Sequence, residues 1–413
     1  MNRRNFLAST AAAAAVAAND KVNIGIIGVR GRGRALAGEF GALPDVNIAC
    51  LCDVDSRVFD RAAKALEEKN RAKPRYVSDL RRLLDDKSID AVVIATPDHW
   101  HGPAAILACN AGKDVYVEKP ASHNFREGLL MIEAARRNNR VVQVGTQSRS
   151  RNSTRRAIEY VQSGKIGRVL MAKAWDVQLR ENIGRKPDSP APAEVDYDTW
   201  TGAALALPFN ENRFHYKWHW NWNYGTGDMG NDGVHQLDIA RWALGAGLPS
   251  EVCGHARKLF FDDDQQTPDT MNITFNYPGQ VLEFEMRIWN PYGMEGQDNG
   301  VAVYGTTGAV HIGRWDRQWG FRVYDEKHKL AHEEYGSEYE HARNFVDCIR
   351  SRQKPNADIE IGHTSTALCH LGNIVAKTGR NLKFDSAART ISSDAEAAKL
   401  LGRSYRKHWS TPA

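Results

Sequence analysis

A run of β-branched residues that ends in a glycine-rich turn constrains the fold more than any other feature. Residues 22–28 read Val-Asn-Ile-Gly-Ile-Ile-Gly, and a segment of helix-forming composition starts near Gly33. The turn between them, Gly-Val-Arg-Gly-Arg-Gly, approximates the pattern G-x-G-x-x-G, with Arg30 in place of the second glycine. A tight turn before a helix N-terminus with free N–H groups can hold a pyrophosphate. The sequence therefore predicts a nucleotide-binding site, and the alternative is a glycine-rich turn without a ligand.

Apolar strands continue to alternate with helices as far as about residue 147. Continuous apolar strands separated by helices indicate a parallel sheet that is covered on both faces. We therefore expect residues 19–148 to form an α/β domain with a doubly wound parallel sheet, a Rossmann domain. The runs that predict its further strands are Val46–Cys52, Ala91–Ala95, Val115–Val117 and Val141–Val144.

The residue after the second predicted strand indicates which nucleotide binds. Asp53 lies twenty residues beyond Gly33. A carboxylate at this place binds ribose hydroxyls and repels a 2′-phosphate, which favours NAD over NADP. Gly31 stands one place after the expected second glycine, and Arg30 and Arg32 could pair with a phosphate.

The pattern changes after residue 148, and we expect a second domain over residues 149–413. Apolar and polar residues alternate strictly along 271–277 and 282–288, with Pro278-Gly279 between them. This pattern predicts a hairpin in an open, mostly antiparallel sheet. Helices are predicted near 338–352 and 364–377, so the domain is of the α+β class, and a C-terminal extension follows from Asn381.

In the second domain, a predicted helix near 152–163 and a strand near 169–177 precede an irregular stretch, residues 178–232, that is rich in Pro, Trp and Tyr. A loop of this length in a compact protein is usually functional. Its aromatic side chains suit the apolar faces of a sugar ring, with Trp220 and Tyr224 as candidate contacts, although they could instead form a small core. His215 and His219 are four residues apart, but no helical pattern surrounds them, so we expect no metal site.

Two signatures resemble those of a known family. The first is Asp-Ala-Val-Val-Ile-Ala-Thr-Pro-Asp-His-Trp-His over residues 90–101, followed by Ala-Gly-Lys at 111–113 and Glu-Lys-Pro at 118–120. Here the sequence resembles the Gfo/Idh/MocA oxidoreductases, whose lysine lies beside the nicotinamide and the substrate hydroxyl. The resemblance implies that Lys119 is catalytic and that the cofactor contacts Thr96, Pro97, Trp100, His101, Glu118 and Lys119.

The chemistry of Lys119 supports this assignment independently. A side chain at the carboxyl end of a parallel strand points into the crevice where ligands bind, and partial burial lowers a lysine pKa toward a useful range. The alternative is a surface lysine that pairs with Glu118.

The second signature surrounds His235. Its residues 231–235 read Asn-Asp-Gly-Val-His, where the family often has D-x-G-x-H at the substrate. His235 matches, but the Asp position is Asn231, and Asp232 comes one place later. Asparagine cannot act as a base, although it can position a hydroxyl. An Asn at this position also resembles the family branch that contains the NAD-dependent glycosidases of glycoside hydrolase family 109. The alternative for His235 is a helix-capping or core histidine.

The resemblance implies three further contacts. Gln147 and Arg149 match the family's N-x-R at the domain junction, with Gln in place of Asn. We expect Gln147 at the cofactor, and Arg149 and Asp232 at the substrate. In family members the open sheet commonly mediates dimer or tetramer formation, so a homo-oligomer is expected.

Residues 1–18 resemble a twin-arginine export signal. Arg3-Arg4 precede Phe6-Leu7, an alanine-rich stretch follows, and Ala15-Val16-Ala17 resembles a cleavage site. The alternative is a disordered basic terminus. The signal predicts a periplasmic protein that folds around its cofactor before export, and its removal changes the net charge from +5 to +3.

Composition argues against several other classes of protein. The 55 basic and 50 acidic residues are interleaved, which does not indicate nucleic-acid binding. No apolar run after the N-terminus is long enough to span a membrane. The six cysteines include no CxxC pair, so Cys50 and Cys52 are expected to be buried free thiols.

These observations predict an exported enzyme that retains NAD and oxidises a secondary hydroxyl of a sugar or glycoside. Lys119 or His235 would take the hydroxyl proton, and Asn231 would orient the substrate. One alternative is a glycosidase that oxidises C3 transiently and cleaves by elimination and addition. A second is a sugar-binding protein without catalytic activity, which Lys119 and His235 argue against.

Overall fold

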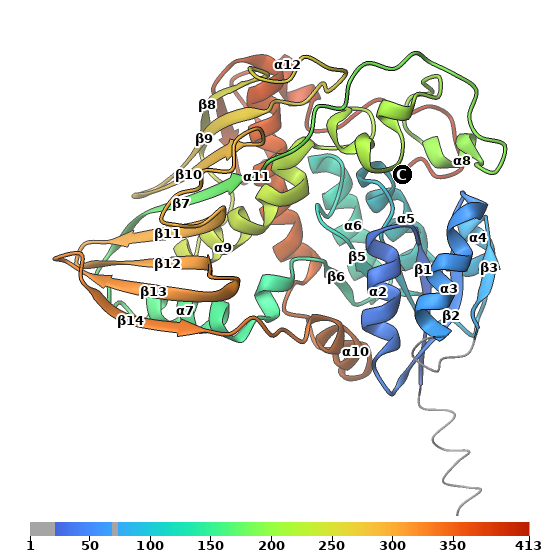
Figure 1. Ribbon diagram of the computed structural model, residues 1–413, viewed down its shortest axis with the longest axis horizontal. Helices are drawn as coiled ribbons and strands as arrows, with labels where there is room; N and C mark the ends of the chain where they lie inside the picture. Colours follow the sequence, from blue (N-terminus) through green and yellow to red (C-terminus); the bar gives the residue numbers. More distant parts are fainter. Residues whose placement is uncertain (1–20, 68–72, 413) are drawn as a thin grey trace, which may run out of the picture.

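The computed structural model describes residues 21–67 and 73–412 (Figure 1). The predicted export signal lies outside these residues. The first domain contains a six-stranded parallel sheet with the strand order β3-β2-β1-β4-β5-β6. Its strands are β1 (Val22–Ile27), β2 (Val46–Cys52), β3 (Arg75–Val77), β4 (Ala91–Ile94), β5 (Asp114–Val117) and β6 (Val142–Val144).

Helices cover both faces of this sheet, as the apolar strands predict. Alternate residues of each strand face opposite layers, so Ile24 and Ile26 pack with α2 and α3, while Ile27 and Ile94 pack with α4, α5 and α6. The doubly wound fold is therefore confirmed. The helices are α2 (Arg32–Gly41), α3 (Phe59–Glu67), α4 (Leu80–Leu84), α5 (Asp98–Asn110) and α6 (Phe125–Arg137).

The second domain contains a ten-stranded sheet with the order β14-β13-β12-β11-β7-β10-β9-β8-β15-β16. Only β7 and β10 pair in parallel; the other pairs are antiparallel, and β9 and β10 form the predicted hairpin. The strands are β7 (Val169–Val177), β8 (Glu251–Arg257), β9 (Thr270–Tyr277), β10 (Gln280–Arg287), β11 (Asn299–Gly305), β12 (Gly308–Trp315), β13 (Gln318–Asp325), β14 (Leu330–Tyr335), β15 (Leu382–Asp385) and β16 (Thr390–Ile391).

One face of this large sheet holds the main core of the second domain. Helices α7 (Asn152–Gln162), α9 (Val234–Leu244) and α11 (Ile359–Thr378) pack there, with Phe275, Leu282 and Phe284 of the hairpin pointing toward them. The polar residues between them, including Glu283 and Glu285, lie on the other face, which is the alternation that the sequence predicts.

The chain returns to the first domain near its end. Helix α10 (His341–Ser351) places Phe345 against Phe40 and Tyr116 of the first domain. Farther on, beyond α12 (Ala395–Lys399), Trp409 packs on Trp100. These contacts join the two domains over a broad area and hold the Rossmann domain in place beside the large sheet.

Two helices begin earlier than the sequence predicts. Helix α5 starts at Asp98 rather than near Pro103, so that Pro103 lies inside the helix as its sixth residue. Helix α11 starts at Ile359, where the Asp358 side chain accepts a hydrogen bond from the Glu360 N–H. Cys50 and Cys52 are buried and free, as expected. In the described part of the chain, no helix has both the length and the apolar character needed to cross a bilayer.

Two glycines in the turn after β1 differ in how much room the structure leaves for a side chain. A Cβ atom at Gly33 would lie 1.7 Å from the Gly28 carbonyl oxygen, whereas a Cβ at Gly31 would meet no atom within 4 Å. We expect Gly33→Ala to lower the free energy of unfolding by at least about 2 kcal/mol, because the backbone has to move. Gly31→Ala is the matched control and should cost less than about 1 kcal/mol. Urea denaturation measures both, and equal losses would contradict this account.

Candidate functional site

A cavity of about 370 Å³ opens at the carboxyl ends of β1 and β4, where the strand order reverses. Ligands bind at this place in doubly wound sheets. Residues from both domains line it. Those that the sequence predicts for the site are Gly28, Arg30, Gly31, Arg32, Asp53, Thr96, Pro97, Trp100, His101, Glu118, Lys119 and Asn231.

The glycine turn forms one end of the cavity. Gly28 has a φ of 82°, and a Cβ there would lie 2.8 Å from the Ala95 carbonyl oxygen, so only glycine fits. Helix α2 begins at Arg32, and Gly31 before it has no side chain to cap the first N–H groups. An uncapped helix N-terminus beside an open turn fits a pyrophosphate. Gly33 does not line the cavity but allows the close contact with Gly28.

Asp53 projects into the cavity from the end of β2. Its Oδ2 accepts a hydrogen bond from the Val29 N–H (2.8 Å), and its Oδ1 accepts one from the Asp55 N–H (3.0 Å). Each carboxylate oxygen keeps a lone pair for a ribose hydroxyl. Burial raises the pKa of Asp53 to about 6, so the carboxylate is mostly ionised at pH 7. On the opposite side, Thr96 Oγ1 is buried and has no partner among the described residues, which leaves it available to a ligand.

Arg32 has a different role from the one that the sequence suggests. Its guanidinium forms ion pairs of 2.8 Å with Glu118 and with Glu39, so it is already neutralised when a phosphate arrives. Although burial opposes ionisation, Arg32 and Lys119 hold the pKa of Glu118 below its usual value. Arg30 is exposed at the cavity and remains the candidate phosphate contact.

The alternative in which Lys119 pairs with Glu118 is not observed. The Lys119 ammonium instead donates hydrogen bonds to the backbone carbonyl and to Oδ1 (3.2 Å) of Asn231. Lys119 follows β5 of the first domain, and Asn231 lies in the helical turn Met229–Gly233, directly before α9 of the second domain. Two domains thus meet at this ammonium group. Asn231 orients the lysine in this structure, whereas the sequence suggested that it orients the substrate.

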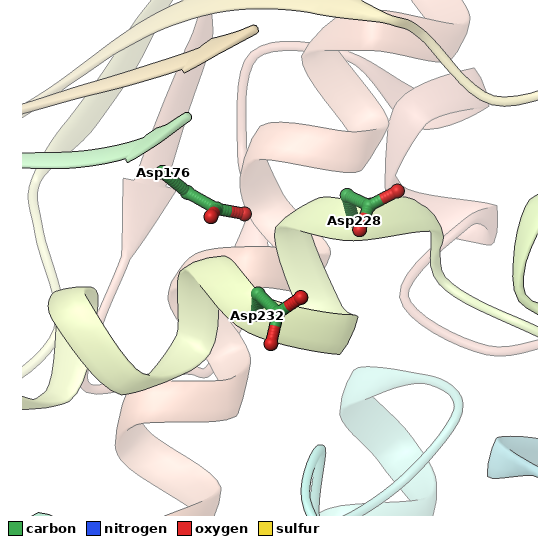
Figure 2. A group of neighbouring side chains, drawn as sticks. All are labelled: Asp176, Asp228 and Asp232. Atoms are coloured by element: carbon green, nitrogen blue, oxygen red, sulfur yellow. The ribbon is translucent and has the colours of Figure 1, made fainter. Parts of the chain in front are cut away.

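Behind Asn231 lies a cluster of three carboxylates that the sequence analysis did not single out as a group: Asp176, Asp228 and Asp232 (Figure 2). One oxygen of each lies within 4.8 Å of the others. Arg180 donates to Asp228 Oδ1 (2.7 Å) and also to Asp232, and so supplies a positive charge to both. Burial, followed by the charges of Asp232 and Asp228, raises the pKa of Asp176 well above its usual value. The protonated form of Asp176 is therefore favoured more than that of an ordinary aspartate, and Arg180 bonds the other two carboxylates.

Asp228 connects this cluster to the lysine. Its Oδ1 accepts a hydrogen bond from the Asn231 amide (3.2 Å), and its Oδ2 accepts one from the Trp220 indole (2.6 Å). The amide of Asn231 is thereby fixed with its oxygen toward Lys119. The sequence placed Trp220 at the substrate, but this tryptophan is buried and holds Asp228 instead.

His235 lies on the first turn of α9, one turn after Asn231. Burial, and then the charge of Lys119, lowers the pKa of His235 to about 4. The imidazole is therefore neutral at pH 7 and can accept a proton. Among the described residues it makes no hydrogen bond that would fix it, which agrees with a group that awaits a substrate rather than with a helix cap.

Six other predicted residues are not among those that line the cavity: Gln147, Arg149, Trp220, Tyr224, Asp232 and His235. Arg149 forms a buried ion pair of 2.8 Å with Asp238, so it joins η2 (Gln147–Ser150) to α9 and does not reach a substrate. Gln147 donates to Tyr116 and Glu118 (3.3 Å each), behind the cavity wall. Tyr224 is fully buried. These placements correct the expected substrate contacts of Arg149 and Tyr224, because family position alone does not show which way a side chain points.

The irregular stretch after β7 forms a small core, as one of the two alternatives predicts, and it also lines the cavity. Trp200, Phe209, Phe214 and Tyr224 pack together as a small core. Another part, residues 214–219, lines the cavity with aromatic side chains. Among them, His215 Nε2 lies 3.2 Å from Asp55 Oδ2, so the segment is fastened to the loop after β2. No sequence signal separates these two groups.

His101 and Trp100 line the cavity from the first turn of α5. The ring nitrogens of His101 lie 2.7 Å from the Pro120 carbonyl oxygen and 2.9 Å from that of Thr96. The histidine therefore ties the loop after β4 to the loop that carries Lys119. Burial lowers its pKa, and a neutral imidazole has a single N–H, so His101 donates to one of these two carbonyl oxygens at a time.

Comparison with known families decides the identity of the fold. The model described as "Oxidoreductase family, NAD-binding Rossmann fold" matches residues 22–146, and the one described as "Oxidoreductase family, C-terminal alpha/beta domain" matches residues 174–411. The chain belongs to the Gfo/Idh/MocA oxidoreductases. Its first domain is the NAD-binding domain of the family, and the turn, Asp53 and Thr96 fit that cofactor.

Curated relatives of this Gfo/Idh/MocA protein include glycosyl hydrolase family 109 proteins. One from Saccharopolyspora erythraea is 35% identical over 170 residues, which are 40% of this chain and 37% of the relative. Another, from Shewanella sp. (strain ANA-3), is 39% identical over 120 residues, 28% of this chain and 26% of the relative. The match thus spans little more than a third of these relatives' length.

Solved structures share the fold over nearly the whole chain. A levoglucosan dehydrogenase in complex with NADH has a TM-score of 0.67 at 19% identity and covers 87% of this chain and 98% of its own. An aldose-aldose oxidoreductase from Caulobacter crescentus, complexed with glycerol, has a TM-score of 0.67 at 20% identity and covers 88% and 100%. At this identity the likeness establishes the architecture alone.

The Asp53 carboxylate makes NAD affinity depend on pH. Its ionised form accepts hydrogen bonds from two hydroxyls, and protonation removes part of that capacity. Because its pKa is raised to about 6, the dissociation constant of NAD should rise as the pH falls from 7 to 5. Isothermal titration measures this, and Asp53→Asn should bind NAD more weakly at pH 7 and lose this pH dependence. An unchanged pH dependence in the variant would contradict the assignment.

Proposed function

We propose that this protein is an NAD-dependent oxidoreductase that oxidises a secondary hydroxyl of a sugar or glycoside to a ketone. The observation that carries the proposal is the position of Lys119. Its ammonium group lies at the carboxyl end of the NAD-binding sheet and is held from the second domain by Asn231. A donor fixed there meets a substrate oxygen between the two domains.

Oxidation of an alcohol removes a hydride from carbon and a proton from oxygen. Bound NAD supplies the chemistry of hydride acceptance. Two of the three ammonium hydrogens of Lys119 are directed to Asn231, and the third is free to donate to the hydroxyl oxygen and to stabilise its developing negative charge. His235 is neutral and takes the hydroxyl proton. The products are a ketone, reduced cofactor and a protonated imidazole that loses its proton to solvent.

The surroundings of the lysine support a sugar as the substrate. Tyr216, Trp218 and His219 line the cavity beside Lys119 and Asn231, and their rings suit the apolar faces of a pyranose. Hydroxyl edges would meet Lys119, His235 and Asp232. Asp232 keeps a free carboxylate oxygen, because Arg180 bonds only its Oδ2. The sugar dehydrogenases with the same fold are consistent with this substrate class.

A redox-neutral glycosidase is the second candidate, favoured by the glycosyl hydrolase family 109 relatives. Oxidation at C3 acidifies the proton on C2, a base removes it, and the aglycone leaves from C1. Water then adds at C1, a proton returns to C2, and the two electrons return to C3. The same lysine and histidine serve the first and last steps, so the site accommodates both reactions.

We further propose that the enzyme works in the periplasm with retained NAD and as a homo-oligomer. The paired arginines at Arg3-Arg4 support export of a folded, cofactor-loaded protein. The open ten-stranded sheet supports the assembly, because the corresponding sheet commonly mediates dimer or tetramer formation in family members. Cell fractionation tests the location, and light scattering tests the assembly.

Product analysis distinguishes the candidates. The purified protein is incubated with a panel of glycosides in deuterated water, and the products are identified by mass spectrometry. A keto-sugar, two mass units lighter than its parent, supports the oxidoreductase. Free sugar with deuterium at C2 supports the glycosidase. If neither forms and denatured protein releases no NAD, the proposal is wrong, and binding without turnover would indicate a sugar-binding protein.

Substitutions at the two proposed catalytic residues should separate their roles. Lys119→Met and His235→Asn should each lower kcat at least 100-fold, the usual range for general acid–base groups, while NAD still binds. His255→Asn, on an exposed part of β8, is the matched control and should leave kcat unchanged. Steady-state kinetics on the substrate found above measures this. A His235→Asn variant with full activity would assign the proton to another group.

A further inference from the structure

A second cavity, of about 430 Å³, lies on the other side of the segment 221–226 and has no lining residue in common with the first. Most of its walls come from the loop before α6, the segment 221–226, the last turns of α11 and residues 400–404, and Leu205, Leu207 and Gln266 complete the lining. None of the described residues that line this cavity is acidic.

Two cations face this space. Lys377 reaches it from the end of α11, and Arg403 reaches it from the C-terminal segment. Among the described residues, neither has a carboxylate oxygen within 4.0 Å, whereas Arg32 at the first cavity has two such partners. A pair of like charges beside one cavity repels, and an anion between them removes that repulsion.

The groups that contact the two cations directly are neutral. The carboxylate of Glu127 acts on Arg403 from a greater distance and is already bonded by the Tyr405 hydroxyl and by the His123 N–H. Arg403 donates to Asn223 Oδ1 (2.7 Å), and its Nη1 lies 3.1 Å from His123 Nδ1. Lys377 Nζ lies 4.2 Å from the centre of the Trp222 ring, so the indole face supports the ammonium without neutralising it.

His123 cannot supply the missing charge. Its Nε2 lies 3.1 Å from the Trp222 carbonyl oxygen, which can only accept, so Nε2 carries the proton and Nδ1 accepts from Arg403. Burial, and then the charge of Arg403, lowers the pKa of His123 well below its usual value. The imidazole is a neutral spacer that orients the guanidinium.

An unpartnered polar atom also points to a ligand. Asn373 is 5% exposed and lines the cavity; its amide nitrogen donates to the Thr226 carbonyl oxygen (2.8 Å), while its Oδ1 is buried without a partner among the described residues. A buried amide oxygen without a donor is costly, and a ligand hydroxyl would satisfy it. Other side-chain amides around the cavity, those of Asn221 and Gln266, add further polar contacts.

We propose that this second cavity binds a small hydroxylated organic anion, with its carboxylate or phosphate group between Lys377 and Arg403 and a hydroxyl on Asn373. The cavity volume and the mixture of amides with one indole face suit a molecule of the size of an acidic monosaccharide. The proposal does not rest on the oxidoreductase function, because the site is separate from Lys119 and His235.

Isothermal titration of the full chain tests the proposal with four probes: D-glucuronate, glucose 6-phosphate, inorganic phosphate and neutral glucose. We expect one or both sugar anions to bind at least tenfold more tightly than glucose and than inorganic phosphate. Preference for glucuronate identifies the carboxylate as the recognised group, and preference for glucose 6-phosphate identifies the phosphate. Inorganic phosphate binding as tightly as either sugar anion overturns the assignment of a hydroxylated ligand.

Variants at the lysine locate the binding. Lys377→Met keeps the side-chain stem on Trp222 without the charge and should weaken the sugar anion at least tenfold, and Lys377→Glu should abolish binding. Lys165→Met is the matched control, because Lys165 lies 4.9 Å from the Tyr160 ring on an exposed surface elsewhere. NAD affinity, measured in parallel, should be unchanged in all three and shows that they are folded. Unaltered anion binding in Lys377→Met overturns the proposal.

Discussion

The hydrogen bonds from the Lys119 ammonium to Asn231 join the two domains at the point where the chemistry is proposed, and the neighbouring charges are arranged around them. Glu118 is adjacent in sequence and could neutralise the lysine, but Arg32 binds its carboxylate. On the other side, Arg180 binds Asp228 and Asp232. Lys119 therefore keeps a neutral amide as its partner. A neutral partner holds a cation without competing for its proton, so the ammonium group stays available to a substrate oxygen.

The Asn231 amide that holds Lys119 is itself fixed by the carboxylate of Asp228. Asp228 receives the Asn231 N–H, the Trp220 indole N–H and the Arg180 guanidinium, which use both of its oxygens. Beside it, burial and the neighbouring carboxylates raise the pKa of Asp176 well above its usual value. A carboxylate that is fully bonded cannot rotate, so the amide of Asn231 is held with its oxygen toward the first domain. Orientation of the Lys119 ammonium thus depends on Asp228 and its partners, none of which bonds the lysine directly.

Most of the fold could be predicted from the sequence, because the signals are local. The apolar runs that end at Gly28 and Asp53 fix two parallel strands, and the alternation around Pro278-Gly279 fixes a hairpin. Local pattern also places Lys119 at a strand end. The local pattern does not show that helix α10 returns to the first sheet, since the apolar face of this helix would suit either domain.

The site was predicted less completely, because the direction of a side chain depends on distant partners. Arg149 and Trp220 stand at positions where a substrate contact is reasonable, yet each meets a buried carboxylate: Asp238 for the arginine and Asp228 for the tryptophan. Arg180 belongs to no recognisable sequence motif, and only its ion pairs with Asp228 and Asp232 reveal its role. Electrostatic partners separated by tens of residues leave no pattern in one sequence.

Transfer of a hydride from a sugar carbon is the central claim, and deuterium labelling measures it most directly. Protein loaded with NAD is mixed with methyl glycosides whose ring carbons carry deuterium. The cofactor is then released, and its mass is measured by mass spectrometry. The account predicts reduced cofactor that has gained one deuterium from the sugar in the wild type and none in Lys119→Met. Cofactor that stays oxidised and unlabelled with every glycoside, or equal labelling in both proteins, would contradict it.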